Sequence, residues 1–143
     1  MKQQEFAESL VEEFLSARVY AVVGVSTNRD KYGYRVYQDL KEGGYTVYPV
    51  NPHYEDIFGE RCYPDLSSLP EKPEVVEFVC PPPVTEQTLY EMKALGIERA
   101  WMQPGAESPQ AIRFCEDQGI KAIHGLCVMV ERRMKRGGKP AED

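Results

Sequence analysis

The chain has 143 residues, of which 42% are hydrophobic and 28% are charged, a composition typical of one globular domain. Its net charge of −6 argues against broad binding to nucleic acid or to an anionic membrane surface. The four cysteines form no C-x-x-C pair and only two histidines accompany them, so no zinc site is predicted. The cysteines are dispersed, and the acidic N-terminus does not resemble a signal peptide, so a cytoplasmic location is favoured. No apolar run approaches membrane-spanning length.

The first elements along the chain are predicted to be a helix, a buried strand and a second helix. Apolar residues at helical spacing indicate an amphipathic helix over residues 4–17. The apolar run Val19–Val25 is typical of a parallel strand that helices cover on both faces. A polar loop, Ser26–Tyr32, then leads into a helix expected over Gly33–Glu42, which Gly43-Gly44 should end.

The middle of the chain predicts two further strands separated by loops. Tyr45–Val50 reads as the second strand and Val75–Cys80 as the next main strand. Between them, residues 53–73 are rich in loop-forming residues. Within this region we expect a short strand over Arg61–Tyr63 and one helical turn within Pro64–Leu69.

The second half continues the alternation of strand and helix. The expected elements are a helix over Val84–Leu95, a strand over Arg99–Met102, a helix that Ser108 and Pro109 open and that runs to Gln118, a strand over Lys121–His124 and a helix over Val128–Arg136. Thr85 is a candidate N-cap. Residues 137–143 are expected to be a flexible tail. The pattern predicts one α/β domain over 1–143: a Rossmann-like, doubly wound, mainly parallel sheet of five to six strands with helices on both faces.

In such a sheet, ligands bind beyond the carboxyl ends of the strands, which directs attention to the turn after the first strand. Gly24 would let a ligand approach the backbone closely. Ser26 and Thr27 can donate hydroxyl hydrogen bonds to a phosphate, and Arg29 and Lys31 can meet further negative charge. The alternative for the two basic residues is an ordinary solvated loop.

The same turn departs from the dinucleotide-binding fingerprint. That fingerprint requires G-x-G-x-x-G and an acidic residue at the end of the second strand. Here Ser26 replaces the second glycine, and the second strand ends in Asn51-Pro52, which offers no carboxylate to a ribose hydroxyl. NAD is therefore disfavoured, and the absence of a Walker A motif gives no support to phosphoryl transfer from ATP.

Two other turns and one aromatic side chain complete the candidate edge. The triplet Pro81-Pro82-Pro83 stiffens the end of a strand and could form a flat apolar wall for a base or a pantetheine arm. Gln103-Pro104-Gly105 follows the next strand and would lie at the same edge. Tyr34 could stack on a base or close over a phosphate, although a role in an interface is an equal alternative.

Four motifs in order carry a resemblance to a known family. They are G-V-S at Gly24–Ser26, G-Y-x-V-x-P-V-N-P at Gly44–Pro52, W-M-Q-P-G at Trp101–Gly105 and C-x-M-x-E at Cys127–Glu131. With these motifs the chain resembles the small stand-alone CoA-binding proteins, which are similar to the N-terminal CoA-binding domain of the succinyl-CoA synthetase alpha subunit. The resemblance extends from about Phe6 to Arg136 and implies a Rossmann-like fold that binds coenzyme A along the strand ends.

The resemblance also implies roles for individual positions. Gly24–Thr27 with Arg29 would hold phosphates, Asn51–His53 would lie beside the adenosine, and Cys80–Pro82 and Met102–Gly105 would flank the nucleotide and the start of the pantetheine. The candidate site therefore comprises Gly24, Val25, Ser26, Thr27, Arg29, Lys31, Tyr34, Asn51, Pro52, His53, Cys80, Pro81, Pro82, Met102, Gln103, Pro104 and Gly105.

The chain departs from the family pattern at two places. Family members often carry an R-x-P turn where this chain has Cys80–Pro83, and D-R-C where it has Gly125–Cys127. The synthetases carry their phosphorylated histidine on a second domain, so the resemblance transfers no catalytic residue to His53 or His124. We therefore expect a non-catalytic module that binds coenzyme A or an acyl-CoA.

Three alternatives to this expectation stay open. They are an NAD(P)-type oxidoreductase or accessory subunit, an interaction protein whose site has decayed, and a thiol-based acyl or redox carrier that uses Cys80. The expected macromolecular partner is a second copy of the chain or a partner enzyme, with neither nucleic acid nor a membrane involved.

Overall fold

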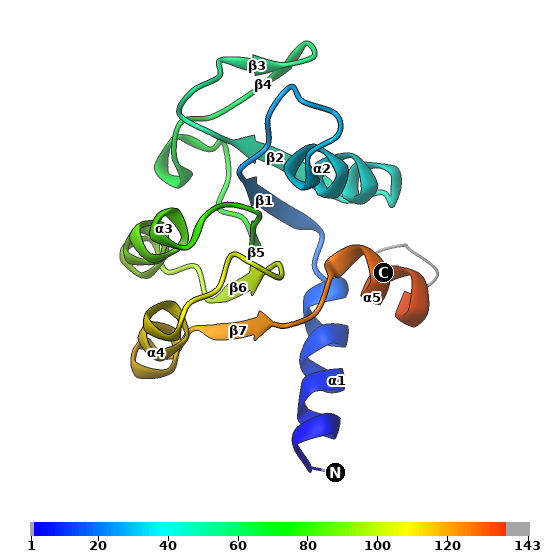
Figure 1. Ribbon diagram of the computed structural model, residues 1–143, viewed down its shortest axis with the longest axis vertical. Helices are drawn as coiled ribbons and strands as arrows, with labels where there is room; N and C mark the ends of the chain where they lie inside the picture. Colours follow the sequence, from blue (N-terminus) through cyan, green and yellow to red (C-terminus); the bar gives the residue numbers. More distant parts are fainter. Residues whose placement is uncertain (1, 137–143) are drawn as a thin grey trace.

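The computed structural model describes residues 2–136, which form alternating strands and helices (Figure 1). In chain order they are α1 (Lys2–Leu15), β1 (Val19–Val23), α2 (Tyr32–Glu42), β2 (Thr46–Val50), β3 (Asp56–Ile57), β4 (Glu60–Arg61), a 3₁₀ turn (Leu66–Ser68), β5 (Val75–Phe78), α3 (Pro82–Leu95), β6 (Arg99–Met102), α4 (Pro109–Gln118), β7 (Lys121–His124) and α5 (Val128–Arg136). None of the helices in this part of the chain combines the length and apolarity that crossing a bilayer requires.

A five-stranded sheet with the order β2-β1-β5-β6-β7 organises the fold. Every neighbouring pair in this sheet is parallel. The chain runs outward from β1 to β2, returns past β1 to β5, and then continues in the opposite direction to β7. The strand order therefore reverses between β1 and β5, as in a doubly wound fold, and this reversal marks the position where such sheets bind ligands.

Helices cover both faces of the sheet, so each strand buries alternate side chains on opposite sides. Tyr20 and Trp101 face a cluster that α1, α2 and α5 complete, whereas Ala21 and Met102 face the cluster under α3 and α4. Every residue of β5 is buried, which explains why this strand reads as a nearly continuous apolar run.

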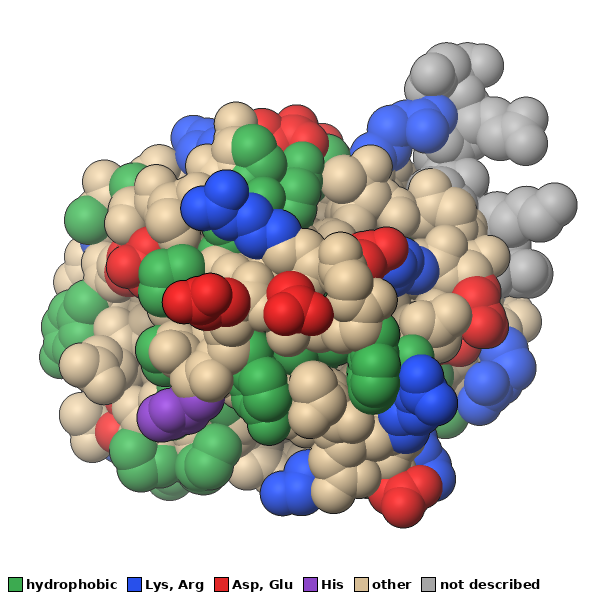
Figure 2. Space-filling model, turned by 90° about the horizontal axis from the view of Figure 1, so that it is seen from above, with side chains coloured by type: hydrophobic (Ala, Val, Ile, Leu, Met, Phe, Trp, Pro, Cys, Tyr) green, Lys and Arg blue, Asp and Glu red, His purple; other side chains and the backbone are tan. Residues whose placement is uncertain are grey.

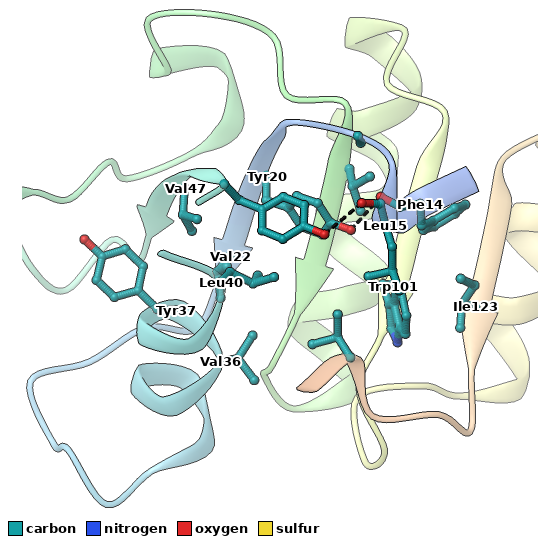
Figure 3. Packing of buried hydrophobic residues seen from close by; sticks show 14 of the residues in the cluster. Phe14, Leu15, Tyr20, Val22, Val36, Tyr37, Leu40, Val47, Trp101 and Ile123 are labelled. Carbon is teal, nitrogen blue, oxygen red and sulfur yellow. Dashed lines mark hydrogen bonds between the residues drawn. The ribbon is translucent and has the colours of Figure 1, made fainter. Parts of the chain in front are cut away.

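Two tyrosine hydroxyls connect α1 to the first of these clusters (Figure 3). Tyr20 donates a hydrogen bond of 2.7 Å to the carbonyl of Phe14, and Tyr45 donates one of 2.7 Å to the carbonyl of Leu15. These carbonyls belong to the last turn of α1, where the regular intrahelical donors end, and the Phe14 carbonyl also accepts from the Ala17 N–H at 3.1 Å. The buried hydroxyls therefore help to satisfy the end of the helix while their rings fill the core.

The structure corrects the predicted start of the third helix. α3 begins at Pro82 rather than at Val84, and Pro81 occupies the N-cap position. Thr85 is therefore not an N-cap: it is fully buried inside the helix, and its Oγ1 lies 3.3 Å from Cys80 Sγ. Prolines fit the first helical positions because the N–H groups that they lack would have no intrahelical acceptor there.

The structure also corrects the short strand that was predicted over Arg61–Tyr63. Asp56–Ile57 and Glu60–Arg61 instead pair as an antiparallel hairpin, and Tyr63 forms only an isolated bridge with Val50. The helical turn expected within Pro64–Leu69 is present at Leu66–Ser68. The predicted flexible tail at 137–143 lies outside the described residues.

Candidate ligand site at the carboxyl edge of the sheet

The turn after β1 is fixed by two close backbone approaches that only glycine permits. Gly24 has a φ of +112°, and a Cβ atom added to it would lie 2.0 Å from the Val79 carbonyl oxygen at the end of β5. A Cβ atom on Gly33, in the first turn of α2, would lie 2.1 Å from the Gly24 carbonyl oxygen. The first turn of α2 is therefore packed directly against the point where the strand order reverses.

The N-terminus of α2 offers hydrogen-bond donors at this position. Lys31 is the N-cap residue but makes no side-chain capping bond, and the first turn carries no acidic residue. The first turn of α2 has N–H groups that precede the first intrahelical bonds, those of Tyr32, Gly33 and Tyr34. They donate to no acceptor within residues 2–136. Free N–H groups at the positive end of a helix favour an anionic ligand group.

The N-terminus of α3, on the other side of the same turn, has the opposite character. Pro81, Pro82 and Pro83 have no N–H group. The next two N–H groups, from Val84 and Thr85, donate to the Pro81 carbonyl at 2.9 and 3.3 Å. This helix end is therefore apolar and offers no free N–H group to an anion, in contrast to the N-terminus of α2.

The loop between β1 and α2 is ordered by its own side chains. Ser26 Oγ accepts a hydrogen bond of 3.2 Å from the Asn28 N–H, and Asn28 Oδ1 accepts one of 3.0 Å from the Asp30 N–H. The Val25 side chain is completely buried, so this candidate residue can offer only its backbone to a ligand. Thr27 is exposed beside it.

Two basic residues of this loop, Arg29 and Lys31, are exposed. The Arg29 guanidinium lies over the ring of Phe58, with 4.1 Å between its central carbon and the ring centroid. Figure 2 views the molecule from the end where β3 and β4 lie in Figure 1, and its Lys and Arg side chains are interspersed with Asp and Glu. This mixed surface fits a small anionic ligand better than a long polyanion.

At the end of β2, the Asn51 side chain connects two strand ends instead of standing free. Its Nδ2 donates to the Val25 carbonyl at 2.8 Å, and its Oδ1 accepts from the His53 N–H at 2.9 Å. Both ends of the amide are thus used inside the protein. Pro52 and His53 are exposed next to it and are the parts of this motif that a ligand can reach.

At the end of β6, Gln103 has a comparable internal role. Only 4% of its surface is exposed, its Oε1 accepts from the Val128 N–H at 2.7 Å, and its Nε2 donates to Cys127 Sγ at 3.5 Å. The side chain therefore caps the start of α5. Met102 is buried, which leaves Pro104-Gly105 as the exposed part of this motif.

Sequence reasoning missed one aromatic residue that the fold brings to the loop. Phe58, at the tip of the β3–β4 hairpin, meets the Tyr34 ring edge to face with 5.5 Å between ring centroids. The Tyr34 hydroxyl donates to Gln38 Oε1 at 3.4 Å. A bulky residue directly before Gly59 in a predicted loop was the only signal for this contact in the sequence.

Burial makes the Cys80 thiol a poor nucleophile. Its contact with Thr85 favours the thiolate, but desolvation dominates and raises the pKa of Cys80 to about 11. We expect iodoacetamide to alkylate Cys80 slowly at pH 7.5, with a rate that rises about tenfold per pH unit towards pH 11, because only the thiolate reacts. Peptide mass spectrometry over a pH series measures this rate, and rapid modification at neutral pH would revive the thiol-carrier alternative.

Comparison with known proteins identifies the family. Residues 18–133 match the model of the CoA-binding domain. The chain belongs to this CoA-binding domain family. Its match includes β1 through most of α5, so all the strand ends described above lie within the family's domain.

Individual relatives agree with this assignment. An ADP-forming acetate–CoA ligase of Archaeoglobus fulgidus is 27% identical over 128 residues, which cover 82% of this chain but only 19% of the ligase. A conserved hypothetical protein of Pyrococcus furiosus has a similar structure, with a TM-score of 0.76, 43% identity and coverage of 80% of this chain and 98% of that one. A hypothetical protein of Pyrococcus horikoshii has a TM-score of 0.84, 30% identity and coverage of 89% and 90%.

Proposed function

We propose that the protein binds coenzyme A or an acyl-CoA at the carboxyl ends of β1, β2, β5 and β6. One observation carries the proposal: the Gly24 turn is packed against the first turn of α2, whose N–H groups are unused within the described chain. A phosphate group of the ligand would accept hydrogen bonds there. The apolar wall at Pro81–Pro83 would face the base or the pantetheine.

The proposed function is binding or regulation in the cytoplasm rather than catalysis. Cys80, the nucleophile candidate at this edge, has a raised pKa because it is buried. The chain also spans only 19% of the acetate–CoA ligase to which it is similar, and the activity of that whole enzyme is not part of this proposal. We propose that the protein assembles with a second copy of the chain or serves a partner enzyme.

An NAD-type ligand receives less support from the site. The end of β2 carries Asn51, whose amide is already bonded to Val25 and His53, so no carboxylate is positioned for a ribose hydroxyl. The exposed residues that follow are Pro52 and His53.

Isothermal titration with coenzyme A, NAD and ATP tests the proposal. We expect coenzyme A to bind most tightly of the three. Arg29→Ala should weaken that binding about tenfold, because a charge-assisted contact between arginine and phosphate is worth about 1.5 kcal/mol or more.

Arg113→Ala provides the matched control, since Arg113 is a basic residue on α4 rather than on the β1–α2 loop. The affinity of this variant for coenzyme A should equal that of the wild type. Tighter binding of NAD than of coenzyme A would overturn the proposal. Equal losses of affinity in both arginine variants would mean that Arg29 has no specific role and belongs to an ordinary solvated loop.

A further inference from the structure

The tip of the β3–β4 hairpin holds an aromatic residue in an unfavourable backbone conformation. The two tip residues, Phe58 and Gly59, have φ values of +49° and +89°. Turns of this kind favour asparagine or glycine at the first position, because a larger side chain crowds the backbone. Phe58 is the one non-glycine residue with a positive φ among residues 2–136.

Core packing does not explain this conformation. The Phe58 side chain is 48% exposed, so much of its apolar surface stays in water. Strain that persists at an exposed position points to a role for the side chain itself. The ring contacts Arg29 and Tyr34, and both are candidate site residues.

The base of the hairpin is fixed to α2, the helix whose N-terminus forms the proposed phosphate site. Glu60 accepts a hydrogen bond of 2.6 Å from the Tyr37 hydroxyl and forms an ion pair of 2.6 Å with Lys41. These contacts lower the pKa of Glu60, with Lys41 contributing most, so the carboxylate stays charged. Ile57, one residue before the tip, is buried in the core. The ring of Phe58 therefore has a defined position relative to α2.

Arg29 gains order from this ring without losing its hydrogen-bonding capacity. The central carbon of the guanidinium lies 4.1 Å from the Phe58 ring centroid. A cation held over a ring in this way needs no hydrogen-bond acceptor from the ring, so its N–H groups can still donate to a ligand. No carboxylate within the described chain forms an ion pair with Arg29. An exposed arginine would otherwise sample many rotamers, and restricting them in advance lowers the entropic cost of binding.

We propose that Phe58 is a positioning residue that holds the Arg29 guanidinium ready for a phosphate group of the ligand. This inference rests on the proposed binding of coenzyme A. The hairpin, which lies outside the five-stranded sheet, thereby becomes part of the ligand site through Arg29. In this proposal Phe58 acts only through Arg29 and does not itself contact the ligand.

A double-mutant cycle with coenzyme A as the titrated ligand tests the inference. Phe58→Leu keeps an apolar side chain but removes the ring, and it should weaken binding about threefold to fivefold. Phe58→Trp retains an aromatic face and should bind as the wild type does. In the Arg29→Ala background, Phe58→Leu should cause no further loss, because the guanidinium that it positions is gone.

Thermal unfolding of each variant separates positioning from a general loss of structure. The expected midpoints lie close to the wild type, since Phe58 is half exposed and Arg29 is a loop residue. Arg29→Lys is a second test that leaves the hairpin unchanged. It keeps the positive charge but replaces the guanidinium with an ammonium group, and it should weaken binding to a similar degree.

The outcomes distinguish this inference from the function on which it rests. If the wild-type protein does not bind coenzyme A, both the proposed function and the role of Phe58 are wrong. If Phe58→Leu leaves the affinity for coenzyme A unchanged, the role of Phe58 is wrong and the proposed function stands. The same holds if Phe58→Leu lowers the affinity equally in the wild-type and Arg29→Ala backgrounds.

Discussion

Gly24→Ala is expected to destabilise the protein by about 3–5 kcal/mol, combining a backbone penalty with overpacking. At a φ of +112° an alanine is strained, and its Cβ would lie 2.0 Å from the Val79 carbonyl oxygen. That atom belongs to the backbone after β5 and cannot rotate away. A loss of this size approaches the whole stability of many domains, so urea denaturation followed by circular dichroism should show a large shift or an unfolded variant.

Gly105→Ala separates the two causes of this loss. Gly105 has a similar φ of +99°, but a Cβ atom added there meets nothing within 4 Å. Its substitution should therefore cost only the backbone penalty, about 1–2 kcal/mol. Equal stabilities of the two variants would show that the approach between Gly24 and β5 is not a tight contact, and the geometry of the proposed phosphate turn would need revision.

The sequence predicted the sheet well because parallel strands have few degrees of freedom. The strands β1 and β2 are short, mainly apolar runs that end at residues unable to continue them, Gly24 and Asn51-Pro52. Alternation with helices then limits the topology to a doubly wound sheet. The parts that were wrong, the start of α3 and the β3–β4 hairpin, depend on cap chemistry and on a turn in which Phe58 occupies a glycine-like position.

The candidate site was less predictable because the use of a polar side chain depends on distant neighbours. Asn51 and Gln103 occur in motifs that suggest ligand contact, yet their amides bond to groups 26 and 25 residues away in the chain. Spacing in the sequence contains no information about those partners. The carboxyl edge could be identified from strand ends alone, whereas the roles of individual amides could not.

Glu77 on the central strand β5 is another polar side chain whose surroundings could not be predicted from the sequence. Glu77 interrupts the apolar run of β5, and in an antiparallel sheet such a residue would face water. Here helices cover both faces, so Glu77 lies beside Val22 and Trp101 on the neighbouring strands and is completely buried. Neither of its carboxylate oxygens has a hydrogen-bond partner within the described chain.

This burial gives the protein a defined pH dependence of stability. Desolvation, with a smaller contribution from nearby Cys127, raises the pKa of Glu77 well above its usual value. In the unfolded chain the carboxyl ionises near pH 4.3, whereas the folded protein keeps the proton to a higher pH. Stability from this group is therefore fully present below about pH 4.3 and falls as the pH rises towards the folded-state pKa.

Glu77→Gln and Glu77→Leu test this account through urea denaturation at pH 5, 7 and 8. Glutamine cannot ionise, so the free energy of unfolding should fall less between pH 5 and pH 8 than in the wild type. Leucine also removes the unsatisfied polar atoms and should raise stability at pH 7 by about 1–3 kcal/mol. Glu98→Gln, at an exposed position, serves as the control and should keep the wild-type pH dependence. Parallel curves for Glu77→Gln and the wild type would mean that the buried carboxyl finds a partner in solution, and the core around Cys127 would then be the place to search for it.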